Sequence, residues 1–155
     1  MNTGFKIFDY FSYFKMKDIW FAFILPALFG LFFLKNTDLF VLGINVQYVF
    51  LYISFSFLIF LMGVYSLNDK GFKNKLKEED KIKKDNKYKF FIYNIGYGLF
   101  YDLFLIILIN LFFIQYTPLI YFLFVFSVFH LGYLVFTSLN IMLLTLYKIE
   151  KQNSF

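Results

Sequence analysis

The sequence predicts an all-α, polytopic membrane protein with four transmembrane helices, both termini in the cytoplasm and an N-terminal interfacial helix. Hydrophobic residues make up 61% of its 155 residues and charged residues only 16%, whereas soluble domains average about 45–50% and about 25%. The apolar residues also fall into segments that suit spanning helices of about 20 residues. We expect a multi-pass protein of the plasma (inner) membrane with five parts: interfacial segment 1–18, first two transmembrane helices 19–67, cytoplasmic Lys-rich loop 68–89, last two transmembrane helices 90–147 and cytoplasmic tail 148–155.

The N-terminal segment alternates aromatic and charged side chains, which is typical of a short amphipathic helix lying in the membrane interface. The first span follows it, and Trp20 is expected at the headgroup level. Ala22, Pro26 and Gly30 share one face of this span, so a neighbouring helix can approach closely. Pro26 should also kink the helix and free a backbone carbonyl group.

The second span ends at Asn68 and Asp69, and nine lysines follow before the next apolar segment. This stretch is too charged to enter a bilayer. Its middle has no apolar stripe beyond Leu76 and Ile82, so we expect a loop that includes one short surface helix. Its lysines suit contact with anionic lipid headgroups.

A tight turn separates the third and fourth spans. Thr117 as the N-cap and Pro118 at the first helical position mark the start of the fourth span. This span is about 45 Å long at 1.5 Å per residue, which exceeds a hydrocarbon core of about 30 Å. It should therefore tilt or project into the cytoplasm. The four spans are expected at residues 19–34, 46–67, 90–113 and 118–147.

The distribution of lysines sets the expected orientation in the membrane. Three precede the first span, one follows it, nine follow the second, none follows the third and two follow the fourth. By the positive-inside rule, both termini and the central loop lie in the cytoplasm. The net charge of +5 is thus read as a topology signal, and no nucleic-acid partner is expected.

Composition narrows the chemistry that one chain can perform. There are no cysteines and only one histidine, so disulfides, thiolate catalysis and a multi-histidine metal site are excluded within one chain. No Gly-rich phosphate loop, serine nucleophile motif or metal-binding helix motif is present. These absences favour a protein that is not an enzyme and that needs no cofactor.

Polar side chains inside the third and fourth spans are the next candidates. An ionisable residue within a span is a functional candidate by default, although packing or hydrogen bonding between helices explains such residues equally well. Four polar residues of the fourth span fall within an arc of about 80°, which should face the bundle interior. Two interpretations are open for the polar residues of both spans. They form hydrogen bonds between helices, or they line a proton relay or a ligand cavity. The residues are Asp102, Asn110, His130, Tyr133, Thr137 and Asn140.

The Asn68-Asp69 pair allows two interpretations. It can simply stop a helix and make a turn. A role in binding a divalent cation with a diphosphate needs several oxygen ligands, and the nearby carboxylates are outnumbered by lysines. These carboxylates are Glu78, Glu79, Asp80 and Asp85.

On these residues the chain resembles the N-terminal half of the UbiA-type membrane prenyltransferases. The residues that carry the resemblance are Lys15, Lys17, Trp20, Pro26 and Gly30 around the first span, and Asn68-Asp69 after the second. The resemblance implies that Asp69 holds magnesium. It also implies a cytoplasmic site for a prenyl diphosphate made by Asn68, Asp69, Lys70 and Lys73.

The chain departs from the family pattern after this pair. Where that motif continues with aspartates, this chain has Phe72 and Leu76, which cannot bind a metal. The family also has about nine spans and two Asp-rich motifs, whereas four spans and one incomplete motif are expected here. A complete prenyltransferase site in one chain is therefore not expected.

Three functions remain open on the sequence. The first is a non-enzymatic four-helix membrane protein that acts by associating with itself, as a homo-oligomer, or with a membrane partner subunit. The second is a half-length or degenerate UbiA-like protein that binds a prenyl diphosphate with magnesium. The third is an oligomeric channel or transporter that uses Asp102 and the polar stripe beginning at His130.

Overall fold

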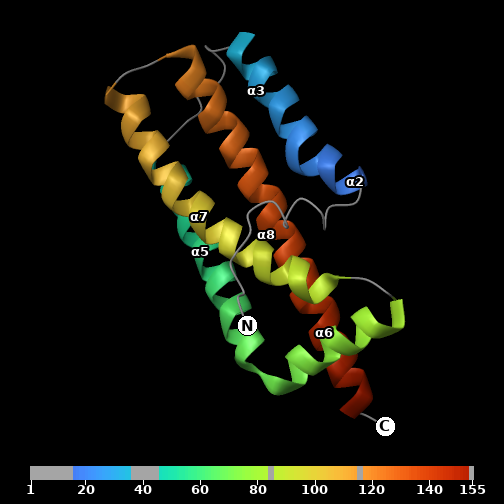
Figure 1. Cartoon of the computed structure of the whole chain (residues 1–155). Coiled ribbons are helices and arrows are strands. Elements are labelled where there is room, and N and C mark those ends of the chain that lie inside the picture. Colours follow the sequence, from blue (N-terminus) through green and yellow to red (C-terminus); the bar gives the residue numbers. More distant parts are fainter. Residues whose placement is uncertain (1–15, 36–45, 84–85, 115–116, 154–155) are drawn as a thin grey trace, which may run out of the picture.

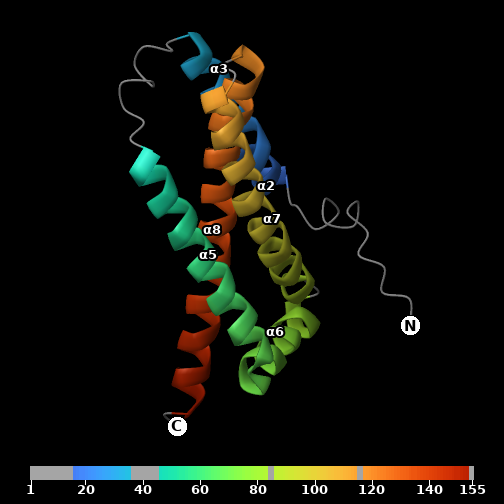
Figure 2. The same ribbon diagram turned by 90° about the vertical axis from the view of Figure 1, so that its left-hand side faces the viewer.

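The computed structural model describes residues 16–35, 46–83, 86–114 and 117–153, and nearly all of this part of the chain is helical (Figures 1 and 2). No strand occurs among these residues. Most of the predicted interfacial segment, the break after the first span and the last two residues of the tail lie outside the described residues. The elements are α2 (Met16–Ile19), η1 (Trp20–Ile24), α3 (Leu25–Lys35), α5 (Val46–Asn68), α6 (Lys70–Lys83), α7 (Lys87–Ile114) and α8 (Pro118–Asn153).

Three of these helices are long and apolar enough to cross a membrane. The apolar stretches are Tyr48–Asn68, Lys87–Leu111 and Pro118–Gln152. They confirm long apolar helices at the second, third and fourth predicted spans. The first predicted span is a shorter apolar helix, Trp20–Lys35, which α2 extends back to Met16. The chain is thus a helical membrane protein.

Helix α8 packs against every other long element and forms the axis of the molecule. Near its N-terminus, Phe122 lies against Gly30 of α3, and His130 contacts Ala22 of η1, so the first helix runs antiparallel to α8. Helix α5 runs parallel to α8, since the Tyr52 hydroxyl donates to the Val128 carbonyl at 2.9 Å and, further along both helices, the Ser66 hydroxyl donates to Met142 Sδ at 3.9 Å. As Figure 2 shows, α3 lies beside the upper part of α8 and α5 beside its lower part.

Two helix-level predictions are confirmed at the ends of α3 and α8. A Cβ atom on Gly30 would lie 2.8 Å from the Phe122 ring, so this position does allow a close approach between helices. Thr117 caps α8: its Oγ1 accepts the backbone N–H of Ile120 at 3.2 Å, and its carbonyl accepts that of Tyr121 at 3.0 Å. Pro118 then occupies the first helical position, where no N–H is needed.

The Lys-rich stretch differs from the predicted loop, because most of it is the 14-residue helix α6. Phe72 and Leu76 are each only 1% exposed, and the ring of Phe72 packs against Phe91 of α7 with centroids 5.8 Å apart. Phe72, Leu76 and Glu79 recur at the spacing of successive helical turns, so they lie on one side of α6, and this side packs against the bundle. The prediction missed this face because it is only three residues long within a run of lysines.

Carboxylates of α6 tie the ends of two other helices together. Asp80 accepts the backbone N–H groups of Lys87 at 2.8 Å and Tyr88 at 3.0 Å, so it caps the N-terminus of α7. Buried Glu79 lies 2.6 Å from the Lys148 ammonium and 3.6 Å from that of Lys87. This contact explains why the predicted tail is helical to Asn153: the end of α8 rests on α6, as Figure 1 shows.

Candidate functional site

The Asn68-Asp69 pair lies at the junction between α5 and α6. Asp69 is the N-cap of α6, since its Oδ1 accepts the backbone N–H of Phe72 at 2.7 Å and its carbonyl accepts that of Lys73 at 3.1 Å. Asn68 ends α5, and Lys70 begins α6 with an exposed side chain. Among the described residues, no group of three or more histidine, aspartate or glutamate side chains could hold a metal ion. The arrangement here is that of a helix stop and cap.

The cap makes a direct prediction for two substitutions of Asp69. Asp69→Ala should lower the free energy of unfolding by about 1 kcal/mol, because it removes the N-cap oxygen, whereas Asp69→Asn should change it by only a few tenths. Unfolding of the purified protein by SDS, followed by circular dichroism, measures both. Equal losses for the two variants would contradict a capping role.

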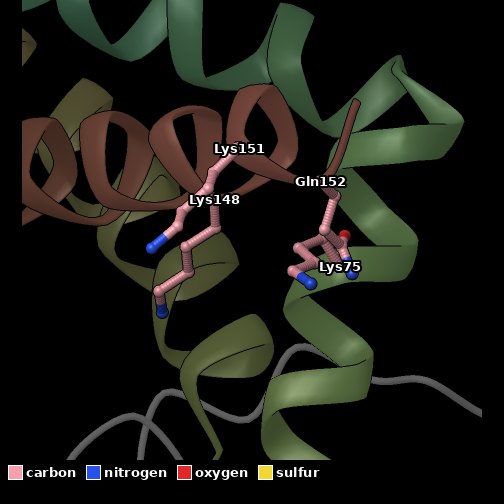
Figure 3. Close-up of a pocket in the computed structure, with 4 residues that line it drawn as sticks. All are labelled: Lys75, Lys148, Lys151 and Gln152. Atoms are coloured by element: carbon pink, nitrogen blue, oxygen red, sulfur yellow. The ribbon is translucent and has the colours of Figure 1, made fainter. Parts of the chain in front are cut away.

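A shallow cleft lies between α6 and the end of α8 (Figure 3). Its volume is about 400 Å³, and it is lined by Lys75 of α6 and by Lys148, Lys151 and Gln152 of α8. The Lys148 ammonium also pairs with Glu79, so part of the positive charge is already neutralised. Three of its four lining residues are lysines, and sequence reasoning missed it because Lys75 lies more than 70 positions from the other three.

His130 is buried at the contact between η1 and α8. Its Nδ1 lies 2.6 Å from the carbonyl oxygen of Ala22, and because a carbonyl can only accept, Nδ1 carries the hydrogen. In a regular helix the carbonyl of Ala22 would accept the N–H of residue 26, but Pro26 has none. The freed carbonyl predicted from Pro26 is therefore present, and His130 supplies the missing donor.

Rings surround this imidazole on several sides. The centroid of His130 lies 4.6 Å from that of Tyr101, 4.9 Å from Phe23 and 5.7 Å from Phe126. Such a cage excludes water and strengthens the contact to the Ala22 carbonyl. The contacts described for His130 are thus those of an interhelical hydrogen bond within an aromatic cluster.

If His130 replaces the donor that Pro26 lacks, the two residues must be energetically coupled. His130→Phe should cost about 1 kcal/mol in the wild-type background. The cost should fall towards zero beside Pro26→Ala, because the new N–H of residue 26 can reach the Ala22 carbonyl. A double-mutant cycle of SDS unfolding free energies measures this coupling; an unchanged cost of His130→Phe in both backgrounds would rule the pairing out.

Asp102 lies in the middle of α7 with only 2% of its surface exposed. One carboxyl oxygen, Oδ1, is hydrogen bonded to the Ser56 hydroxyl of α5. The other, Oδ2, is buried and has no hydrogen-bond partner among the described residues. Asp102 therefore links α5 to α7 through only one of its two carboxyl oxygens.

The remaining polar residues of the predicted stripe have different surroundings. The Asn94 amide of α7 donates to Thr137 Oγ1 at 2.9 Å, to Ser138 Oγ at 2.8 Å and to the Leu134 carbonyl at 2.8 Å. Thr137 is thus part of a buried clamp between α7 and α8. The clamp through Asn94 and Ser138 was missed, because a sequence does not specify which helices are neighbours.

The polar residues of the fourth span do not all face the interior, as the stripe predicted. His130 is buried, Tyr133 and Thr137 are half-buried, and Asn140 is exposed. Tyr133 lies within electrostatic reach of Asp18, at the end of α2. Asn110 on α7 is also exposed, and its Nδ2 donates to the Ile106 carbonyl of its own helix at 2.7 Å. The stripe fails because its arc only partly overlaps the buried side of α8, which includes Leu134, Ser138 and Met142, and Asn140 lies at the edge farthest from that side.

Comparison with protein families, with characterised proteins and with solved structures finds no match for this chain.

Proposed function

We propose that this chain is a small four-helix membrane protein that acts by associating with copies of itself or with a membrane partner. In this proposal it spans the plasma (inner) membrane four times, with both termini and α6 in the cytoplasm. The first span is the continuous helix from Met16 to Lys35, about 30 Å long. One chain then has no complete active site.

The observation that carries this proposal is how the polar side chains are used. Asp69 caps α6, His130 holds the Ala22 carbonyl, and Asn94 clamps α7 to α8. Each of these contacts is made to another group of the same chain, so the side chains that looked most like site residues serve the fold. A protein built this way works through its surface.

The mass of the purified protein in a mild detergent tests this function. Light scattering should give a protein mass of at least two chains of 18.7 kDa, or one chain with a co-purifying partner. A single chain without any partner, across a range of detergent concentrations, would count against association.

A second candidate function is supported by the basic cleft of Lys75, Lys148, Lys151 and Gln152. A cluster of ammonium groups suits the phosphates of an anionic lipid, including the prenyl diphosphate that the UbiA-like resemblance implies. Magnesium would then be bound with the diphosphate at Asp69, beside Asn68, Lys70 and Lys73. Asp69 would have to do so with the oxygen that is not capping α6.

Binding of farnesyl diphosphate to the purified protein, with and without magnesium, tests the second candidate. Asp69→Asn retains the N-cap but loses the carboxylate, so it should abolish the magnesium-dependent part of binding without unfolding α6. Binding that is equal in wild type and Asp69→Asn would remove the metal from this site. No binding by wild type would end the second candidate.

A channel or transporter is a third candidate, and the unpartnered Oδ2 of Asp102 supports it. A buried carboxyl oxygen without a partner is a place where a proton or cation can bind within a span. Proton and cation flux into proteoliposomes should then fall in Asp102→Asn. Absence of flux in wild type, or equal flux in both proteins, would exclude this use of Asp102.

A further inference from the structure

Exposed amides lie on two outer faces of the bundle, Asn140 on α8 and Asn110 on α7. One outer face of α7 surrounds its amide with exposed apolar side chains. Its most outward residues recur at alternating spacings of three and four, which is the spacing of a left-handed helix pair. The four apolar members are strongly exposed, for example Leu103 at 64% and Ile107 at 56%. We call this set the α7 stripe; its members are Phe100, Leu103, Ile107, Asn110 and Ile114.

Asn110 is the member that lipid does not satisfy. One N–H of its side chain donates to the Ile106 carbonyl of its own helix. Its Oδ1 and its second N–H have no partner among the described residues. The residue lies within the apolar stretch Lys87–Leu111, where hydrocarbon offers neither donors nor acceptors. An amide in this position favours a partner that has both.

A second copy of the chain provides such a partner. Two copies inserted with the same orientation are related by a two-fold axis along the membrane normal, so their α7 helices run parallel and equal positions face each other. Asn110 then meets Asn110 of the second copy. The free N–H of each amide can donate to the free Oδ1 of the other, as a single asparagine does at one core position of a parallel helix pair.

We propose that the α7 stripe is the surface through which two copies of this chain associate, with Asn110 paired to its own equivalent. This inference rests on the proposed function, since it names the face and the partner for self-association. The apolar members pack around the amide pair and exclude lipid from it. Asn110 fixes the register of the two helices.

The outer face of α5 provides an internal comparison within the same molecule. Its outermost residues are equally exposed, with Leu51 at 65% and Leu58 at 58%. This face has no amide, and Tyr48 and Tyr65 lie near its two ends, about 25 Å apart along the helix. Aromatic residues at both ends of an apolar face suit the two lipid interfaces, so we expect lipid to cover α5.

Disulfide cross-linking tests the interface directly, because the chain has no cysteine of its own. Single variants Leu103→Cys and Ile107→Cys report on α7, and Leu51→Cys and Leu58→Cys report on α5. A disulfide forms only when the two Cα atoms come within about 7 Å. In oxidised proteoliposomes of the full chain, both α7 variants should form covalent dimers and the α5 variants should form few. Similar yields from α5 and α7, or higher yields from α5, would overturn the inference.

The role of Asn110 is tested in the same assay. Asn110→Leu should weaken the dimer about tenfold and reduce cross-linking through Ile107→Cys, whereas Asn110→Gln should restore part of it because it keeps an amide. Unchanged dimerisation in Asn110→Leu would overturn the amide pair. A protein that is dimeric by light scattering but does not cross-link through α7 would disprove this interface and leave the proposed function standing. A monomer in both assays, with no partner that co-purifies, would disprove both.

Discussion

Gly98→Ala should lower the free energy of unfolding by about 1–3 kcal/mol, as overpacking of a well-packed core does. A Cβ atom on Gly98 would overlap the ring of Phe60, a side chain of α5 with no exposed surface. Either the buried Phe60 ring or the two helices must move once that methyl group is added. Elsewhere in a helix, Gly→Ala is stabilising by up to about 1 kcal/mol, so a loss here isolates the close approach of α5 and α7.

Gly96, on the same helix and half-exposed, provides the matched control. Gly96→Ala should be neutral or stabilising in the same SDS unfolding experiment. Phe60→Leu should relieve the overlap, so Gly98→Ala should be less costly in that background than in wild type. A neutral Gly98→Ala would mean that α5 and α7 do not pack at this position.

Asn94→Leu should have the second large effect, a loss of about 2 kcal/mol. Hydrogen bonds between membrane helices contribute about 0.6 kcal/mol on average and up to about 1.7, and the buried Asn94 amide makes three contacts to α8. Its two N–H groups share these three acceptors. Leucine has a similar volume, so the change removes the polar contacts while keeping the packing.

Asn140→Leu is the control for this prediction, because Asn140 is exposed on α8 and outside the Asn94 clamp. Its effect on the SDS unfolding free energy should be within about 0.5 kcal/mol, as for most surface substitutions. Equal losses from Asn94→Leu and Asn140→Leu would show that the clamp is not a principal link between α7 and α8.

Much of the helical framework could be predicted from the sequence, because long apolar segments, lysine clusters and helix caps are local signals. Thr117 and Pro118 predicted the start of α8, and Pro26 predicted a freed carbonyl. The continuation of α8 to Asn153 could not be predicted, because it depends on Glu79, a residue of α6. The buried face of α6 could not be predicted for the same reason. Phe72 and Leu76 are buried only because α7 packs against them.

The candidate site was less predictable than the fold. A single sequence shows that Asp69, Asp102 and His130 have unusual positions, but not which atoms they contact. The structure pairs each of them with a group on another turn or helix: the Phe72 N–H, the Ser56 hydroxyl and the Ala22 carbonyl. The basic cleft could not be predicted, since Lys75 and Lys148 meet only through the fold.

The central claim is that this chain acts through association within the membrane. Its most direct test is the mass of the protein complex in nanodiscs excised from the native membrane by an amphipathic polymer, without any detergent step. We expect complexes that contain two or more copies of the 18.7 kDa chain, or one copy with a defined partner subunit. A single chain in every nanodisc, with no other protein bound, would contradict it.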